Sequence, residues 1–226
     1  MAERENRMSD TTSHKLPRLL AIILGACGAL MLVLGISIYA VTSSQLASQQ
    51  ITVASLNHGS TPNGPNAGKT IKGPFTAISQ IQAIEHHMRQ AGQTATGGTS
   101  DPTTGVVTGG DTGITYGNAP SLSLDAQGNC AATGALWTDP AGLGTVQCTT
   151  AGQPPEVTGS INPTALAGVR GTLMNGSFLV SSLYVSVLAF GVSALIGGLG
   201  LLFMVVCVMG VKLAVKRENP AAEATD

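Results

Sequence analysis

The sequence predicts a membrane all-α protein, a hairpin of two transmembrane helices with an extracytoplasmic loop domain. Three observations predict this fold class: only 10% of the 226 residues are charged, two long segments carry no charge, and basic residues crowd the two tails. A soluble domain usually has about 25% charged residues. The low charge therefore indicates that much of the chain faces lipid.

Each uncharged segment has the length of a membrane-spanning helix. Residues 19–41 form the first apolar run and residues 185–211 form the second. An apolar helix of about 20 residues crosses a hydrocarbon core of about 30 Å, and lipid leaves the backbone no hydrogen-bond partner outside its own helix. The first run is longer than the roughly 7–15 apolar residues of a secretory signal, so we expect it to be a retained anchor.

The basic residues orient this hairpin. Seven of the 11 Lys and Arg residues lie in the two tails, residues 1–18 and 212–226, whereas residues 42–60 have none. The tail residues concerned are Arg4, Arg7, Lys15, Arg18, Lys212, Lys216 and Arg217. Because Lys and Arg beside a span favour the cytoplasmic side, we expect a multi-pass plasma-membrane protein with both termini cytoplasmic and residues 42–184 outside.

The four cysteines fit this topology. Cys27 and Cys207 lie inside the apolar runs, whereas Cys130 and Cys148 lie in the loop domain. Thiols oxidise outside the cytoplasm, so a Cys130–Cys148 disulfide is predicted. A metal site at these cysteines lacks further ligands, because there is no C-x-x-C and no nearby histidine.

An amphipathic helix is predicted near the start of the loop domain. Pro74 suits a first helical position, and apolar residues then recur at three-to-four spacing until Gly92, which predicts about 15 helical residues. The apolar residues are Phe75, Ile78, Ile81, Ile84 and Met88. Since such a stripe needs a surface to cover, we expect Phe75, Ile78 and Ile81 to dock on a partner.

The rest of the loop domain gives weaker signals. Residues 91–120 are rich in Gly and Thr, which predicts irregular loop or short exposed strands. Residues 135–138 and 145–148 flank a Pro-Ala-Gly turn and predict a small disulfide-closed hairpin. Asn162 is placed to cap, and Pro163 to open, a helix that runs on into the second span.

One segment imitates a nucleotide-binding motif. Residues 63–75 read NGPNAGKTIKGPF, in which Gly68-Lys69-Thr70 matches the end of the phosphate-loop pattern G-x-x-x-x-G-K-[ST]. The position five residues before Gly68 is Asn63 instead of glycine, and the predicted topology places the segment outside, away from ATP. The loop domain also has too few basic residues for nucleic acid. We therefore expect neither nucleotide nor nucleic acid as a partner.

A resemblance to a known family rests on three segments. They read AGKTIKGPFTA at 67–77, MNGSF at 174–178 and AFGVSALIGGLGLLF at 189–203. Together they resemble actinobacterial two-span membrane proteins that are often described as aromatic ring-opening dioxygenases. Proteins of this kind are also similar to accessory subunits of the actinobacterial respiratory supercomplex, which joins a menaquinol:cytochrome c reductase to a cytochrome c oxidase. The resemblance covers about half of the chain and implies a place beside reductase and oxidase subunits.

An aromatic ring-opening dioxygenase would require a set of iron ligands in this sequence. Such an enzyme needs iron ligands, typically two His and a carboxylate. The histidines are His14, His58, His86 and His87. Glu85 precedes His86 and His87, but adjacent helical residues point about 100° apart, which makes the two histidines an awkward pair for one metal. We expect no catalytic or metal residues, with an extracytoplasmic metal-dependent enzyme as the alternative.

Small residues recur every four positions on both apolar runs. The first run has Ala21, Gly25 and Ala29, and the second has Ala189, Ser193 and Gly197. Small side chains let helices approach closely in lipid. Two interpretations stay open: the helices pack only on each other, or one small face also docks on a larger partner.

The sequence thus predicts a non-catalytic accessory or assembly subunit of a membrane complex, without a cofactor. The expected partners are the lipid bilayer and integral membrane subunits, with the respiratory reductase and oxidase suggested by the resemblance alone. A stand-alone cell-envelope protein is a further alternative.

Overall fold

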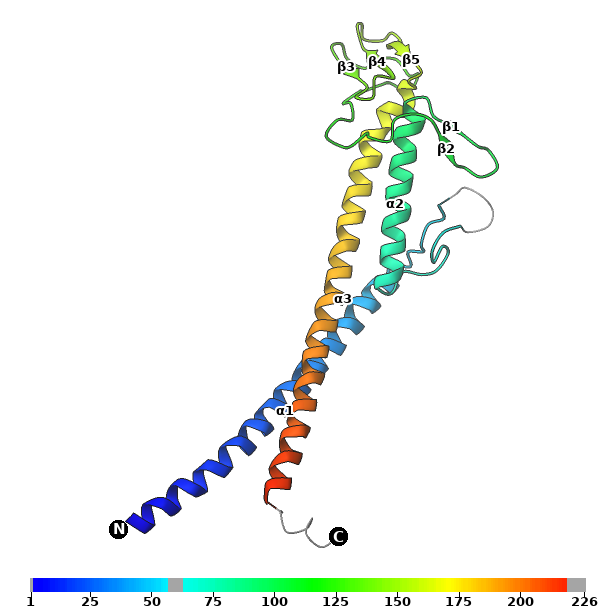
Figure 1. The fold of residues 1–226 in the computed structure, drawn as a ribbon. Helices are drawn as coiled ribbons and strands as arrows, with labels where there is room; N and C mark the ends of the chain where they lie inside the picture. Colours follow the sequence, from blue (N-terminus) through cyan, green and yellow to red (C-terminus); the bar gives the residue numbers. More distant parts are fainter. Residues whose placement is uncertain (1, 57–62, 219–226) are drawn as a thin grey trace. The chain divides into compact units, whose positions relative to one another are not determined.

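The computed structural model describes residues 2–56 and 63–218, and in this part of the chain there are three helices and five short strands (Figure 1). The helices are α1 (Ala2–Ser48), α2 (Pro74–Ala95) and α3 (Pro163–Glu218). The chain divides into two compact units. We call Met1–Gln45 with Leu188–Asp226 the helical-pair unit, and Leu46–Val187 the central unit.

Two helices are long and apolar enough to cross a membrane. The qualifying stretches are Leu19–Ser48 and Pro163–Lys212, so both helices exceed the spans of 19–41 and 185–211 predicted above. The first helix continues past Val41 because residues 42–48 contain neither Gly nor Pro to end it. Large apolar side chains of the helical-pair unit are widely exposed; Ile22, for example, is 68% exposed. Such a surface suits lipid.

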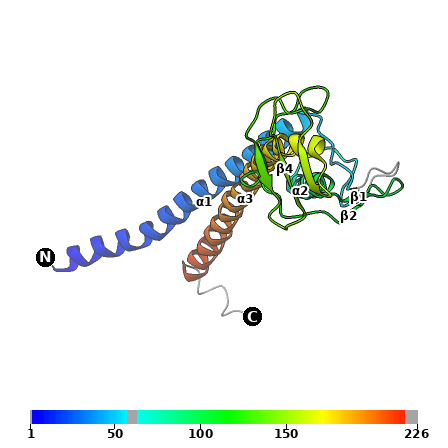
Figure 2. The same cartoon turned by 90° about the horizontal axis from the view of Figure 1, so that it is seen from above.

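The central unit has its own hydrophobic core. The core joins the end of α2, the loops after it, the disulfide region and the first turns of α3. Its buried members are Ala95, Ile114, Ala119, Leu122, Cys130, Val146, Cys148, Ile161, Leu166, Val169 and Leu173. The first part of α3 also lies beside α2 (Figure 1, Figure 2), where Gly176 faces Ile84 and Met88.

Helix α2 begins as predicted but ends later. Pro74 occupies the first turn, and the Thr76 hydroxyl accepts the Gly73 amide at 3.2 Å. The helix runs for 22 residues, so the predicted stop at Gly92 is wrong. A Cβ at Gly92 would lie 3.3 Å from Ile114 Cβ, which shows that this glycine lets a loop approach the helix. The end comes at Thr96, whose hydroxyl donates to the Gly92 carbonyl at 2.9 Å.

The strands form two small antiparallel sheets. β1 (Thr99–Ser100) pairs with β2 (Val107–Thr108), and both are largely exposed, as predicted for this Gly/Thr-rich region. The turn between them is held by Asp101, whose Oδ1 accepts the amides of Thr103 (2.7 Å) and Thr104 (3.3 Å). These backbone hydrogen bonds lower the pKa of the Asp101 carboxyl.

The predicted hairpin is confirmed and has a third strand. β3 (Leu136–Thr138), β4 (Gly144–Gln147) and β5 (Glu156–Gly159) pair in that order, all antiparallel. The predicted disulfide is also present: Cys130 and Cys148 are bonded, with their Cα atoms 5.7 Å apart. The all-α class therefore has to be amended to include a small sheet.

Helix α3 begins where the sequence predicts. The Asn162 side chain accepts the Ala165 amide at 3.1 Å and so caps the helix, and Pro163 is the first helical residue. The helix then continues without interruption to Glu218. The prediction of one continuous helix that includes the second apolar run is therefore confirmed.

Candidate functional site

The helices of the helical-pair unit contact each other through glycines. A Cβ built on Gly28 would lie 2.7 Å from the Gly200 carbonyl oxygen, and one on Gly35 would lie 2.7 Å from the Ser193 carbonyl oxygen. No side chain fits between the two backbones at either point. The two backbones therefore touch directly, which is the close packing that small residues permit in lipid.

The residues predicted for helix packing take different places in this contact. Gly25 faces Cys207, with a built Cβ 2.8 Å from its sulfur, and Ser193 is buried at 3% exposure. Gly197 lies against Gly35. The remaining three are half-buried or exposed: Ala21 and Ala189 are half-buried, and Ala29 is exposed.

Sequence reasoning missed three of the closest-packed residues. They are Gly28, Gly35 and Gly200. Their signals were a seven-residue repeat of glycine on the first helix and a G-x-x-G step, Gly197 to Gly200, on the second. A four-residue repeat identified small faces but did not say which face is used.

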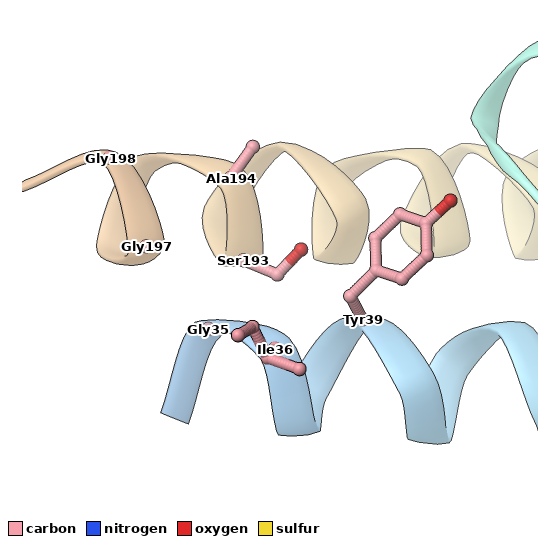
Figure 3. Close-up of a pocket in the computed structure, with 7 residues that line it drawn as sticks. All are labelled: Gly35, Ile36, Tyr39, Ser193, Ala194, Gly197 and Gly198. Atoms are coloured by element: carbon pink, nitrogen blue, oxygen red, sulfur yellow. The ribbon is translucent and has the colours of Figure 1, made fainter. Parts of the chain in front are cut away.

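A groove opens beside this contact, with a volume of about 260 Å³ (Figure 3). The residues that line it are Gly35, Ile36, Tyr39, Ser193, Ala194, Gly197 and Gly198. A Cβ on Gly197 or Gly198 would meet no atom within 4 Å, so one wall of the groove is bare backbone. The Tyr39 ring closes one end and packs against Phe190, with ring centroids 5.0 Å apart.

The predicted docking residues of α2 do not share one environment. Phe75 is 78% exposed and Ile78 is 39% exposed, whereas Ile81 is 2% exposed. Ile81 is thus packed inside the central unit and is not accessible to a partner in this structure. Phe75 and Ile78 remain available, and their docking stays a prediction.

A second apolar groove lies on the central unit, with a volume of about 250 Å³. Tyr116, Met174, Ser177, Phe178 and Ser181 line it. Phe178 is 67% exposed, although it precedes the predicted span. One wall is held by Arg170, whose guanidinium lies 4.7 Å from the centroid of the Tyr116 ring.

The Arg170 side chain ties this groove to the loops after α2. Its Nη1 donates to Ser121 Oγ at 2.7 Å and to the Ala119 carbonyl at 3.3 Å. A guanidinium over an aromatic face adds a cation–π attraction. Two hydrogen bonds therefore hold the Arg170 guanidinium in place over the Tyr116 ring.

The histidines of α2 stand apart from any group of ligands. The ring centroids of His86 and His87 are 6.1 Å apart, and His86 Nε2 is buried without a hydrogen-bond partner. Among the described residues, no three His, Cys, Asp or Glu side chains gather as a metal site. His58 lies outside the described residues, and so does the His14 side chain.

The glycine-lysine-threonine segment forms a short ladder with the chain that follows α1. Thr70 pairs with Thr52 in an antiparallel bridge. The Gly68 amide donates to the Val53 carbonyl (2.9 Å), and the Lys69 amide donates to the Asn66 carbonyl (3.0 Å). In a phosphate loop such amides point at the ligand, whereas these two are already hydrogen-bonded within the chain.

No protein-family model matches the chain, and neither a curated protein nor a solved structure is detectably similar to it.

Proposed function

We propose that this protein is a non-catalytic accessory or assembly subunit of a larger membrane complex. In this proposal both spans cross the plasma membrane, both termini are cytoplasmic, and the central unit lies outside. The observation that carries the proposal is the exposed apolar groove on the first part of α3. It lies on the segment before residue 185, where the sequence predicts water instead of lipid.

The chemistry of the groove favours a protein partner. Soluble surfaces rarely expose contiguous apolar patches of large size, and such patches mark protein contacts. Phe178 and Tyr116 offer large, rigid apolar area, which is enriched in the energetically important parts of interfaces. Ser177 and Ser181 add hydroxyls at its edge. A partner that buries this groove would gain most of its contact energy from the two aromatic rings.

The groove of the helical-pair unit supports the same proposal from within the membrane. Its bare backbone at Gly197 and Gly198 offers close approach to a further helix, which is how helices associate in lipid. A partner's transmembrane helix would therefore seat beside Tyr39 and Ala194, on the side of α3 that α1 does not cover.

The identity of the complex comes from the resemblance. The segments at 67–77, 174–178 and 189–203 resemble accessory subunits of the respiratory supercomplex. Phe178 of the proposed docking groove lies in the second of these segments. We therefore take the menaquinol:cytochrome c reductase and cytochrome c oxidase as the first partners to test.

The test is a pull-down of the tagged full chain from its native membrane in mild detergent. The eluate is examined by haem absorbance spectra and mass spectrometry. Bands of b-, c- and a-type haem in a stable ratio are the expected result. Phe178→Ser should lower their yield, whereas Leu136→Ser, at an equally exposed leucine on β3 (62%), should not.

Two outcomes count against this function. If the wild-type chain elutes without haem proteins, the respiratory assignment is wrong, and metal analysis of the purified protein then tests the enzyme alternative. If Phe178→Ser and Leu136→Ser both leave the yield unchanged, the groove on α3 is not the docking surface.

A further inference from the structure

The segment that leads into the first turn of α2 presents two cations and an aromatic ring in seven residues. Lys69 and Lys72 are both exposed, and Phe75 follows at 78% exposure. The Lys69 ammonium donates to the Asn66 side chain at 3.1 Å, an uncharged partner, so its charge is not neutralised there. Cations beside an exposed aromatic residue are typical of surfaces that contact anionic lipid.

The backbone ladder places this segment close to the end of α1. The Val53 amide donates to the Lys69 carbonyl (2.8 Å), and the Ile71 amide donates to the Ile51 carbonyl (2.9 Å). Ile51 comes only three residues after Ser48, the last residue of α1, a distance of at most about 10 Å. Lys69 and Lys72 are therefore held within a short reach of the point where the first helix ends.

The length of α1 relates that point to the bilayer. The predicted span ends at Val41, and the seven further helical residues to Ser48 add about 10 Å. The polar headgroup layer adds about 5–8 Å on each side of the hydrocarbon core. By this length along one helix, the last residue of α1 lies just outside the headgroup layer.

The packing of α2 on α3 provides a second, independent argument that the start of α2 lies at the membrane surface. Gly176 faces Ile84 and Met88, and the two helices run in opposite directions (Figure 1). Phe75 is nine residues before Ile84, about 14 Å toward the start of α2. The same distance along α3 from Gly176 reaches Val185, where the second predicted span begins. Phe75 therefore lies at the level at which aromatic side chains meet the membrane interface.

The acidic residues of the central unit are distributed unevenly along the chain. Residues 42–84 contain no Asp or Glu. The first carboxylate is Glu85, in the middle of α2, and the others of the central unit follow in the loops and strands after that helix; they are Asp101, Asp111, Asp125, Asp139 and Glu156. The end at the predicted membrane surface is thus basic, which complements anionic headgroups.

We propose that Lys69, Lys72 and Phe75 form a lipid-contact edge, in which the two ammonium groups bind phosphates of anionic phospholipids and the ring enters the headgroup layer. The inference rests on the proposed membrane location and on no protein partner. A lipid-contact role accounts for the two lysines and the phenylalanine of the segment GKTIKGPF, residues 68–75, which nucleotide binding does not explain. Each lysine near an anionic surface contributes about a fivefold gain in lipid affinity.

The lysines are tested by titrating the purified full chain, in neutral detergent, with phosphatidylglycerol and following bound lipid by native mass spectrometry. The double variant Lys69→Gln/Lys72→Gln should bind about 25-fold more weakly. Arg89→Gln is the matched control: it removes one exposed cation from α2, about 21 Å farther along the helix than Phe75, and should stay close to wild type. Equal binding by all three proteins would overturn the proposal.

The ring is tested by Phe75→Trp in nanodiscs that contain phosphatidylglycerol brominated in the upper part of its acyl chains. The native Trp137, the single tryptophan of the chain, lies on β3 and supplies the unquenched background. The added indole at position 75 should lose emission to the bromine. Leu136→Trp, also on β3, should not.

Each remaining outcome decides against the lipid-contact edge. If the added indole at position 75 keeps its emission in discs but is protected in the native complex, Phe75 contacts a protein partner instead. If the chain does not enter discs, the membrane location itself fails. Both results are independent of the haem pull-down, because only purified protein and lipid are present.

Discussion

A single methyl group at Gly200 should separate the two helices of the helical-pair unit. A Cβ at this position would lie 2.6 Å from the Gly28 carbonyl oxygen and 2.7 Å from the Leu32 amide nitrogen. Ordinary contact begins at 3.4 Å, so Gly200→Ala requires a shift of about 0.8 Å, the difference between 3.4 and 2.6 Å. The obstacles are backbone atoms, which cannot rotate away as a side chain does.

The cost follows from the way helices associate in lipid. Packing between them depends on van der Waals contact and on little else, and a gap of about 0.5–1 Å forfeits a quarter to a half of each contact's attraction. Overpacking of this kind typically costs about 1–3 kcal/mol. The equilibrium between packed and separated helices should therefore fall by about 5- to 150-fold.

A thiol pair reports that equilibrium. A Cβ built on Gly25 lies 3.5 Å from Cys207 Cβ, within the range for a disulfide, so Gly25→Cys should cross-link to Cys207 on mild oxidation. Trypsin cleavage at the lysines and arginines between them then leaves two peptides joined only by that bond. Adding Gly200→Ala should slow the linkage strongly.

Gly198→Ala is the matched control for this cross-link. A Cβ there meets no atom within 4 Å, so the rate should be unchanged. The parent chain, with Cys27 exposed, should show no link to Cys207. If Gly200→Ala links as fast as Gly198→Ala, the direct backbone contact is not what holds the pair together.

Three further predictions concern the central unit. Cys130→Ser should lower the free energy of unfolding by about 3 kcal/mol, because the unfolded chain regains the entropy that the disulfide removes. Cys27→Ser should lower it far less. Thermal unfolding followed by tryptophan fluorescence measures both variants, and equal losses would contradict the role of the disulfide. Arg170→Gln should lower stability in the same assay by about 1–2 kcal/mol through loss of the cation–π contact and of charged hydrogen bonds, and should increase the mobility of Tyr116; an unchanged Tyr116 ring signal in NMR spectra would refute this. The pKa of Asp101 is lowered in the folded protein. The stabilising effect of its carboxylate is therefore complete above the ordinary pKa of 3.8 and is lost as the pH falls through the lowered pKa. Asp101→Asn should abolish that part of the acid sensitivity, and an unchanged acid-unfolding profile would show that the turn does not contribute to stability.

The sequence signals that succeeded are the strong local ones. A long uncharged run in lipid can satisfy its backbone hydrogen bonds only as a helix. Asn162 as the capping residue and Pro163 in the first turn are two independent signals for the start of a helix. The Cys130–Cys148 disulfide could be predicted because the other two cysteines, Cys27 and Cys207, lie within the apolar runs. In each case the residues decide their conformation without reference to distant parts of the chain.

The features that escaped prediction depend on tertiary contacts. Gly92 reads as a helix stop, but its missing side chain makes room for Ile114. Strand β5 is exposed along its whole length and pairs through its backbone, so it lacks the apolar alternation that marks a strand. The glycines at positions 28, 35 and 200 are three among many small residues, and only the geometry of two helices selects them. The same holds for Ile81, whose apolar character does not say whether it faces the chain or a partner.

The membership of the central core sets an order of events during synthesis. Leu166, Val169 and Leu173 complete that core, yet they come late in the chain, at the start of the helix that leads into the second span. Cys130 and Cys148 precede them in the chain and are buried in the same core. The interior around the disulfide can therefore close only after residue 173 has been synthesised.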